Sequence, residues 1–285
     1  MLHKIIKGIA PIAAIALAAG LAGCDGAKVR VGDADGVPLA DLDMSGAPPK
    51  ELVLAGPDKV ILANGEALSI DVSGDQDAVE ALRFSLENGA LAIMRDFEVK
   101  NVRGRAVVNI TMPAPEKIVV AGSGEVEAVE LASNAEVVIA GSGRAKASTV
   151  DSEMLEVVVA GSGTFEAAGN VDRLELNIGG SGTASMRALK ADRAELNIAG
   201  SGNADFSSDG RVEATMVGSG NVRITGSATC EVNAIGSGTV TCQAAPAAEP
   251  AEAQAKASEV KKKAPRTAKT IKPKKPGKKG KPRKA

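Results

Sequence analysis

Apolar and polar residues alternate strictly on both sides of a short glycine-rich break that recurs from about residue 118 onward. Two near-copies show the pattern, RLELNIGGSG at 173–182 and RAELNIAGSG at 193–202. The residues two and four positions before the break are apolar, and the residues between them are mostly polar. Because a period of two puts one face of a strand in a core, the pattern predicts a strand, a corner and a second strand. The apolar spacing of three and four that is typical of helices does not occur.

The break is the triplet Gly-Ser-Gly, which occurs seven times at intervals of 18 to 20 residues. A period of this length indicates a solenoid, in which each repeat buries its apolar edge only against its neighbours. Coils stacked with parallel strands about 4.8 Å apart form a β-helix. We interpret the triplet as a corner of this scaffold, since glycine reaches backbone angles closed to other residues. The first glycines of the corners are Gly122, Gly141, Gly161, Gly180, Gly200, Gly218 and Gly236.

The region from Lys28 to Pro115 is also rich in predicted strands. The segment LRFSLENGALAIMR alternates around Asn88-Gly89, a pair that strongly favours a two-residue β-hairpin turn. We interpret VILANGEALSIDVSG and AVVNITMP in the same way. Irregular opening coils are therefore expected to cap the solenoid, with Lys28–Lys50 only partly ordered.

The first 24 residues have the composition of a secretory leader, with two lysines followed by a short, alanine-rich apolar run. The leader ends in Leu-Ala-Gly-Cys, which resembles the bacterial lipobox and predicts that Cys24 is acylated and anchors the chain to a membrane. The alternative is a chance match within an ordinary signal peptide. Asp25 resembles the inner-membrane retention signal of enteric bacteria, but other lineages sort differently, so the membrane is left open.

Composition excludes several kinds of catalytic site. The only histidine is His3, inside the leader, so a mature chain has no histidine to activate the triplet serines or a cysteine, or to bind zinc. The chain has four phenylalanines and no tryptophan or tyrosine. No lysine follows Gly-Ser-Gly at the spacing of a phosphate-binding loop, and the nine-residue period of calcium-binding repeats is absent. We expect no cofactor and no metal.

Charge is divided unevenly along the chain. Residues 25–242 carry 32 acidic against 18 basic residues, a net charge near −14, whereas residues 243–285 carry 14 basic against three acidic residues. The second segment is rich in alanine, proline and lysine and is predicted to be disordered. Anionic lipid headgroups, cell-wall polymers or the acidic body of the protein are the expected partners of this basic tail, and nucleic acid is not. A spacer without a fixed ligand is the alternative.

A glutamate occupies the fifth position before the triplet in six of the seven coils, and Lys117 takes that position in the first. Stacked coils would align these side chains in one outward row, with Arg173, Arg193 and Arg211 beside the middle of it. The row is either a binding strip for a cation, a basic partner or the tail, or a solvated row that keeps the surface from aggregating. Asparagines at 177, 197 and 233, with Thr215, predict a second row that is a structural ladder, with ligand contact as the alternative. The glutamates are Glu136, Glu156, Glu175, Glu195, Glu213 and Glu231.

Two cysteines, Cys230 and Cys242, fall in inward columns near the last coil. In an oxidising envelope we expect them to form a disulfide that closes a loop of about a dozen residues, which stabilises by about 2–3 kcal/mol. Buried free thiols are the alternative.

The strand IDVSG, the hairpin LRFSLENGALAI, a strand ending at Pro113 and the serial Gly-Ser-Gly coils together resemble the auto-transporter adhesin head GIN domain family. The resemblance covers roughly residues 59–242. It implies a right-handed parallel β-helix in bacterial envelope proteins, often lipoproteins, and supplies no catalytic residues. The basic tail is a departure from the family pattern. The expected organisation is a leader (1–24), a partly ordered linker (25–58), an all-β solenoid of about seven coils (59–242) and a disordered tail (243–285).

Three functions remain open at this level. The first is a non-enzymatic, lipid-anchored envelope protein, facing the periplasm, that presents a rigid β-helix as an adhesin-like surface for an unidentified protein or glycan partner or as a structural spacer. The second is a β-helix enzyme acting on polysaccharides, although Phe165 and Phe206 are predicted to point inward and leave no evident aromatic platform for sugars. The third is a nucleic-acid binder acting through the tail, which lipidation of Cys24 would oppose.

Overall fold

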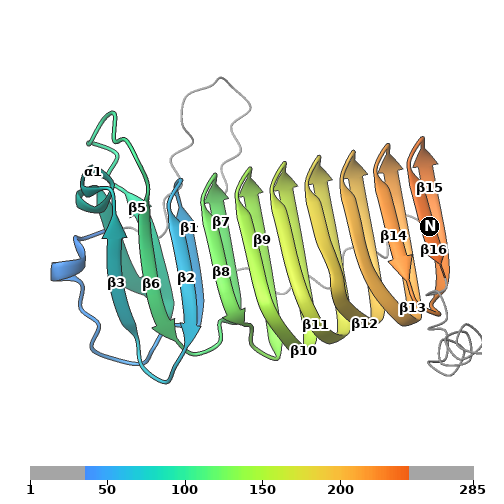
Figure 1. Cartoon of the computed structure of the whole chain (residues 1–285), viewed down its shortest axis with the longest axis horizontal. Coiled ribbons are helices and arrows are strands. Elements are labelled where there is room, and N and C mark those ends of the chain that lie inside the picture. Colours follow the sequence, from blue (N-terminus) through green and yellow to red (C-terminus); the bar gives the residue numbers. More distant parts are fainter. Residues whose placement is uncertain (1–35, 244–285) are drawn as a thin grey trace, which may run out of the picture. The chain divides into compact units, whose positions relative to one another are not determined.

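The computed structural model describes residues 36–243. These residues form one 16-stranded sheet wound into a parallel β-solenoid (Figure 1), so the predicted fold class is confirmed. Cys24, Asp25, the leader and the basic tail beyond Gln243 lie outside the described residues.

The seven triplet coils stack in sequence order, and each coil has two faces. The leading face consists of strand segments that end at a triplet, and the trailing face consists of segments that begin after one. The longer strands run through the gentle bend opposite the triplets, so they supply the trailing face of one coil and the leading face of the next. The strands are β7 (Lys117–Gly122), β8 (Glu125–Glu130), β9 (Asn134–Gly141), β10 (Arg144–Gly161), β11 (Thr164–Gly180), β12 (Thr183–Gly200), β13 (Asn203–Gly218), β14 (Asn221–Thr225), β15 (Thr229–Gly236) and β16 (Thr239–Gln243).

The corners continue the hydrogen-bond ladder from coil to coil. At the fourth triplet, the N–H of Ser181 donates to the carbonyl oxygen of Gly161 at 2.8 Å, and the N–H of Thr183 donates to that of Gly163 at 2.9 Å. The same two bonds recur at neighbouring corners. The backbone N–H and C=O groups at the tight turn are therefore hydrogen-bonded to the neighbouring coil, as buried backbone groups require.

The inward columns form a continuous core along the solenoid. Leu176 and Ile178 of β11 are 0% and 1% exposed, and Phe165 and Phe206 are each 1% exposed. The columns are sealed in every triplet coil except the last, where Val232 is 44% exposed. No further coil stacks on β15 within the described residues, so the inward columns open to solvent at this end.

An additional coil precedes the seven. β1 (Glu51–Ala55) and β2 (Lys59–Asn64) flank a corner made by Gly56-Pro57-Asp58. β1 pairs in parallel with β7 and β2 pairs in parallel with β8, in the same register that joins the triplet coils. β1 lies before residue 59, inside the segment expected to be a linker.

The N-terminal end of the solenoid is closed by strands that leave sequence order (Figure 1). β5 (Ala90–Arg95) and β6 (Ala106–Met112) form a layer parallel to β1 and β2. Outside them lie β3 (Ser69–Gly74) and β4 (Leu82–Glu87), both antiparallel, joined by the helix α1 (Gln76–Glu80). A short 3-10 helix, η1 (Leu39–Asp41), precedes β1. The expected cap is therefore present, and its outer strands run against the direction of the coils.

The hairpin prediction holds for one segment and fails for another. Asn88 and Gly89 join β4 to β5 with positive φ angles of 52° and 79°, as a two-residue turn requires. The segment VILANGEALSIDVSG does contain two strands, β2 and β3, but these do not form a hairpin. β6 lies between them and pairs with both.

Candidate functional site

The six glutamates that precede the triplets lie directly opposite one another on the leading face. Strand register pairs Glu136 with Glu156, Glu156 with Glu175, and so on to Glu231, and it places Lys117 opposite Glu136. We call these six side chains the glutamate row. Their spacing follows from the distance between neighbouring parallel strands, about 4.8 Å.

Basic side chains contact part of the glutamate row. Lys117 Nζ lies 2.7 Å from Glu136 Oε2. Arg211 reaches two members, with Nε 2.9 Å from Glu213 Oε1 and Nη2 3.0 Å from Glu231 Oε2. Arg173 Nη1 lies 3.8 Å from Glu175 Oε1. The predicted arginine column thus stands beside the row and offsets part of its charge.

The environment of the row changes along the solenoid. Burial raises the pKa of Glu156 above its ordinary value, and the neighbouring charges of Glu136 and Glu175 raise it further. Towards the C-terminal end the side chains become more accessible, and that of Glu231 is 75% exposed. The exposed part of the row therefore consists of Glu195, Glu213 and Glu231.

A second outward row lies three positions before each triplet and changes character along the axis. Near the cap it is apolar, with Val53 and Val119 opposite each other. Further along it becomes polar, and Asn197 Nδ2 donates to Asn177 Oδ1 at 3.3 Å. This bond joins two of the three predicted asparagines across neighbouring coils, whereas Asn233 lies opposite Thr215.

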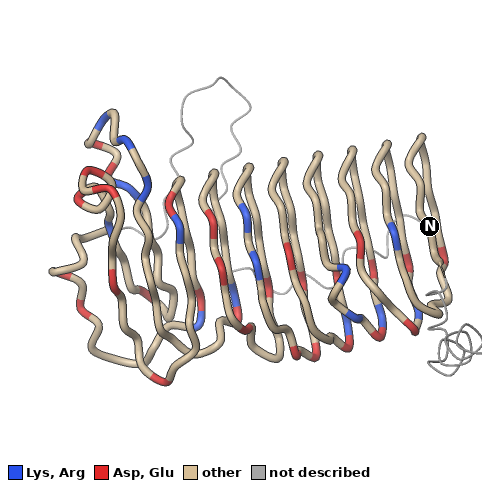
Figure 2. Tube along the Cα trace, in the orientation of Figure 1, with Lys and Arg blue, Asp and Glu red and all other residues tan. Residues whose placement is uncertain are grey.

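On the trailing face, ion pairs join side chains of neighbouring coils. Lys59 Nζ lies 2.9 Å from Glu127 Oε1, and Arg187 Nε lies 2.6 Å from Asp205 Oδ2. Lys190 Nζ lies 2.7 Å from Asp209 Oδ2, and this bond, followed by bonds from Ser227, lowers the pKa of Asp209 to about 2. These charges are paired within the trailing face, just as Glu213 and Glu231 are paired with Arg211 on the leading face, and Figure 2 shows acidic and basic positions along both faces.

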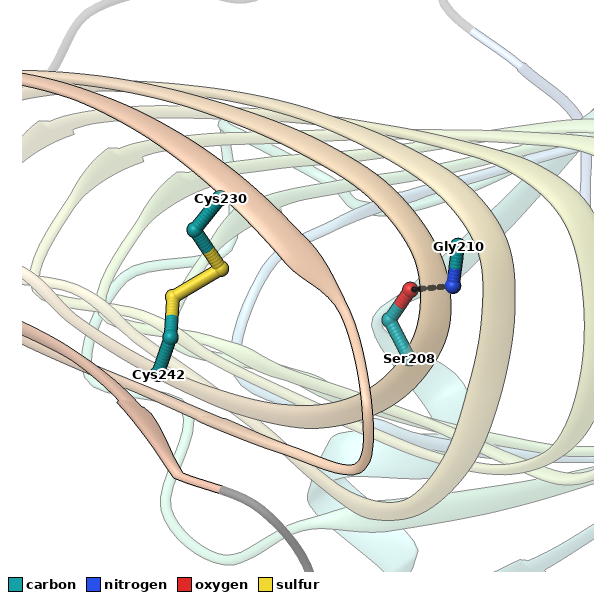
Figure 3. Close-up of a disulfide and its surroundings, with 4 residues drawn as sticks. All are labelled: Ser208, Gly210, Cys230 and Cys242. Atoms are coloured by element: carbon teal, nitrogen blue, oxygen red, sulfur yellow. Dashed lines mark hydrogen bonds between the residues drawn. A yellow bond between two sulfur atoms is a disulfide. The ribbon is translucent and has the colours of Figure 1, made fainter.

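A disulfide joins Cys230 of β15 to Cys242 of β16 across the interior of the last coil (Figure 3). Cys230 is paired in register with Val212 and Cys242 with Ile224, so the two sulfurs stand where earlier coils place apolar side chains. Beside them, at the bend of β13, the N–H of Gly210 donates to Ser208 Oγ at 3.3 Å. The disulfide joins the two faces of the last coil, at the end of the stack where no described coil covers them.

One buried ion pair was missed by the sequence analysis. Asp58 replaces the third glycine of a corner, and its side chain is 1% exposed. Arg95 donates to both carboxylate oxygens, from Nε at 2.8 Å and from Nη2 at 2.6 Å, and the N–H of Ala106 donates to Oδ1 at 2.8 Å. Aligning ELVLAGPDKVILA with KIVVAGSGEVEAV would have revealed this corner, but not the partner of its aspartate. The pair fixes the cap to the first coil.

Among the described residues, no helix is long and apolar enough to cross a membrane, and no group of acidic, cysteine or histidine side chains is arranged to hold a metal ion. Phe165 and Phe206 lie in the core, so they do not form a sugar-binding platform.

Several solved structures share the fold. One, described as a "putative adhesin" from Bacteroides fragilis, has a TM-score of 0.62 and 18% identity, and the match covers 69% of this chain and 92% of that one. A "putative lipid binding protein" from Parabacteroides distasonis has a TM-score of 0.54 and 22% identity, with 70% and 94% covered. A "putative adhesin" from the same species has a TM-score of 0.54 and 18% identity, with 70% and 93% covered.

Among curated proteins, none matches the chain. The family model described as "Putative auto-transporter adhesin, head GIN domain" matches residues 48–228, which include β1 and the Gly56-Pro57-Asp58 corner as well as six of the seven triplets. The chain belongs to the auto-transporter adhesin head GIN domain family.

Proposed function

We propose that the protein is a non-enzymatic binding protein of the bacterial cell envelope, held at a membrane by acyl chains on Cys24. Membership of a family described as an adhesin head supports a binding role, and the Leu-Ala-Gly-Cys ending of the leader supports the anchor. Mass spectrometry of the mature chain is the direct test of the anchor. An acylated cysteine at the N-terminus is expected, and an unmodified start elsewhere would remove the localisation. Separating the inner from the outer membrane and locating the protein would test whether Asp25 acts as an inner-membrane retention signal.

The observation that carries the binding proposal is the glutamate row. Six carboxylates stand in register on one face of a rigid scaffold, and the three nearest the C-terminal end are the most exposed. Repeated carboxylates of fixed spacing favour a partner with several positive charges. Once the first contact has formed, each further contact is intramolecular and raises the overall affinity. A basic segment of a protein, or a glycan bearing amino groups, has this chemistry.

The test replaces Glu195, Glu213 and Glu231 together with glutamine and measures co-sedimentation of the protein with isolated envelope fragments. The matched control replaces Asp151, Glu153 and Asp172, three exposed acids away from the cap, with the corresponding amides, which changes net charge by the same amount. We expect the first variant to bind about tenfold more weakly, since three charged surface contacts of about 0.5 kcal/mol each sum to about 1.5 kcal/mol. Equal binding by both variants would contradict a role for the row.

For the basic tail we propose contact with anionic lipid headgroups or cell-wall polymers. The proposal rests on its 14 basic residues, since each lysine or arginine near an anionic membrane contributes about 1 kcal/mol. A chain ending at Gln243 should keep the β-sheet circular-dichroism spectrum of the full chain and bind anionic envelope material more weakly. Unchanged binding would leave the tail as a spacer.

A further inference from the structure

Phe97 is exposed in a protein that otherwise buries its aromatic residues. Of the four phenylalanines, Phe84, Phe165 and Phe206 are each 1% exposed, whereas Phe97 is 57% exposed. Val99, two residues later, is 46% exposed. Both belong to the segment 96–105 that connects β5 to β6, which we call the cap loop. An exposed aromatic and an exposed aliphatic side chain on one loop indicate a contact surface more than a single exposed residue does.

The cap loop stands where the other coils make a tight corner, and it extends past the ends of β5 and β6 (Figure 1). Three contacts hold its base. The N–H of Asp96 donates to the carbonyl oxygen of Ala81 at 2.8 Å, and the Asp96 carboxylate lies 2.7 Å from Arg83 Nη2. At the other end, the N–H of Arg105 donates to Asp75 Oδ2 at 2.8 Å. Phe97 and Val99 are thus presented from a fixed base, so less conformational entropy is lost when they bind.

Basic residues follow the two apolar side chains in the cap loop. Residues 96–105 read DFEVKNVRGR, with three basic and two acidic residues, and one of the acids, Asp96, is paired with Arg83. Lys100, Arg103 and Arg105 are exposed, and Figure 2 shows the basic positions along the loop. Apolar side chains that enter the acyl boundary, next to cations that meet phosphate groups, are the combination found at membrane-surface contacts.

The cap loop lies at the end of the solenoid that an acyl anchor at Cys24 would hold near a membrane. The first described residues enter beside it, since Val37 exchanges backbone hydrogen bonds of 2.8 and 2.7 Å with Phe84, the neighbour of Arg83. Cys24 precedes Gly36 by twelve residues. An extended chain of that length spans at most about 40 Å. An acyl anchor at Cys24 would therefore hold the cap end within this distance of the bilayer.

We propose that the cap loop is a membrane-contact site, in which Phe97 and Val99 insert at the interface of an anionic lipid bilayer while Lys100 and Arg103 meet its phosphate groups. The proposal extends the lipid-anchored function proposed above, because it takes the anchor as what brings the two surfaces together. It adds an orientation, with the capped end of the solenoid towards the membrane.

The absence of tryptophan from the chain allows a direct reporter. Phe97→Trp, in a chain that begins at Asp25 and so lacks both the leader and the acylated cysteine, should show blue-shifted emission with vesicles of phosphatidylethanolamine and phosphatidylglycerol. Val129→Trp is the matched control, since Val129 is 50% exposed on β8, away from both the cap loop and the point where the basic tail begins. A shift for Phe97→Trp alone supports the proposal. No shift at position 97, or equal shifts at both positions, would overturn it and leave the loop to a protein partner.

A second measurement uses the partition of the same unacylated chain into these vesicles. Replacing Phe97 and Val99 with serine should lower the partition coefficient at least about fivefold, because two apolar insertions are lost. Replacing Val217 and Ile235, which are 51% and 64% exposed, should change it less than about twofold. Equal effects of the two double variants would contradict the proposal. Since acylation is removed in all variants, the result is independent of whether Cys24 proves to be the anchor.

Discussion

The corner architecture can be tested with two adjacent glycines. Gly179 and Gly180 are both exposed, at the end of β11, and differ only in what their backbone demands. Gly180 has a φ angle of +115°, and a β-carbon there would lie 2.6 Å from the carbonyl oxygen of Gly161. That oxygen accepts a hydrogen bond from the N–H of Ser181 at 2.8 Å, so it cannot retreat without losing the bond. At Gly179 a β-carbon would meet nothing within 4 Å.

These geometries give opposite expectations for alanine. Gly180→Ala should destabilise the protein by about 2–6 kcal/mol, the sum of about 1–3 for a disallowed backbone conformation and about 1–3 for the forced contact. Gly179→Ala should be neutral or stabilise by up to about 1 kcal/mol, since alanine restricts the unfolded chain. The coils on either side already carry alanine at this position, Ala160 and Ala199.

Urea denaturation of the two variants and the parent, followed by circular dichroism, provides the assay. The midpoint of Gly180→Ala should fall well below that of the parent, and the midpoint of Gly179→Ala should match or exceed it. If both substitutions shift the midpoint equally, the positive φ angle and the stacked carbonyl are not what selects glycine at the corner.

Three further predictions concern the cap, the open end and the charge pairs. Asp58→Ala leaves the Arg95 guanidinium without its buried partner and should lower the free energy of unfolding, measured in urea, by about 3–5 kcal/mol. Glu116→Ala removes an exposed pair and should lower it by about 1 kcal/mol or less. Similar losses for the two variants would contradict the importance of burial. Reduction of the Cys230–Cys242 disulfide should lower stability by about 2–3 kcal/mol, as a loop of 12 residues implies, and the last coil should lose amide-exchange protection first. Because the folded pKa of Asp209 is lowered from 3.8 to about 2, its contribution to stability is present above pH 3.8 and is lost as pH falls through 2. Carboxyl titration by NMR checks this, and an ordinary pKa would show that the lysine pair does not form in solution.

The repeat determined most of the fold from sequence alone. Alternation around Gly-Ser-Gly defined which residues of each coil face the core, and the period of 18 to 20 residues required stacking. The Asn88-Gly89 hairpin was equally local, since its turn is encoded by two adjacent residues. The glutamate row followed from the same logic, because in-register stacking converts a repeated position into a column. These features depend on short segments and on a rule that holds between every pair of neighbouring coils.

What the tertiary structure alone decided concerns partners that are distant in sequence. Alternation shows that β2, β3 and β6 are strands, but it does not show that β6 inserts between the other two, because a period of two describes a face and not a neighbour. The Gly56-Pro57-Asp58 corner lacks the triplet, and its aspartate is stabilised by Arg95, 37 residues away. The exposure of Phe97 likewise depends on the length of the cap loop and on the contacts that hold its base. Each of these follows from long-range packing, which a local pattern does not specify.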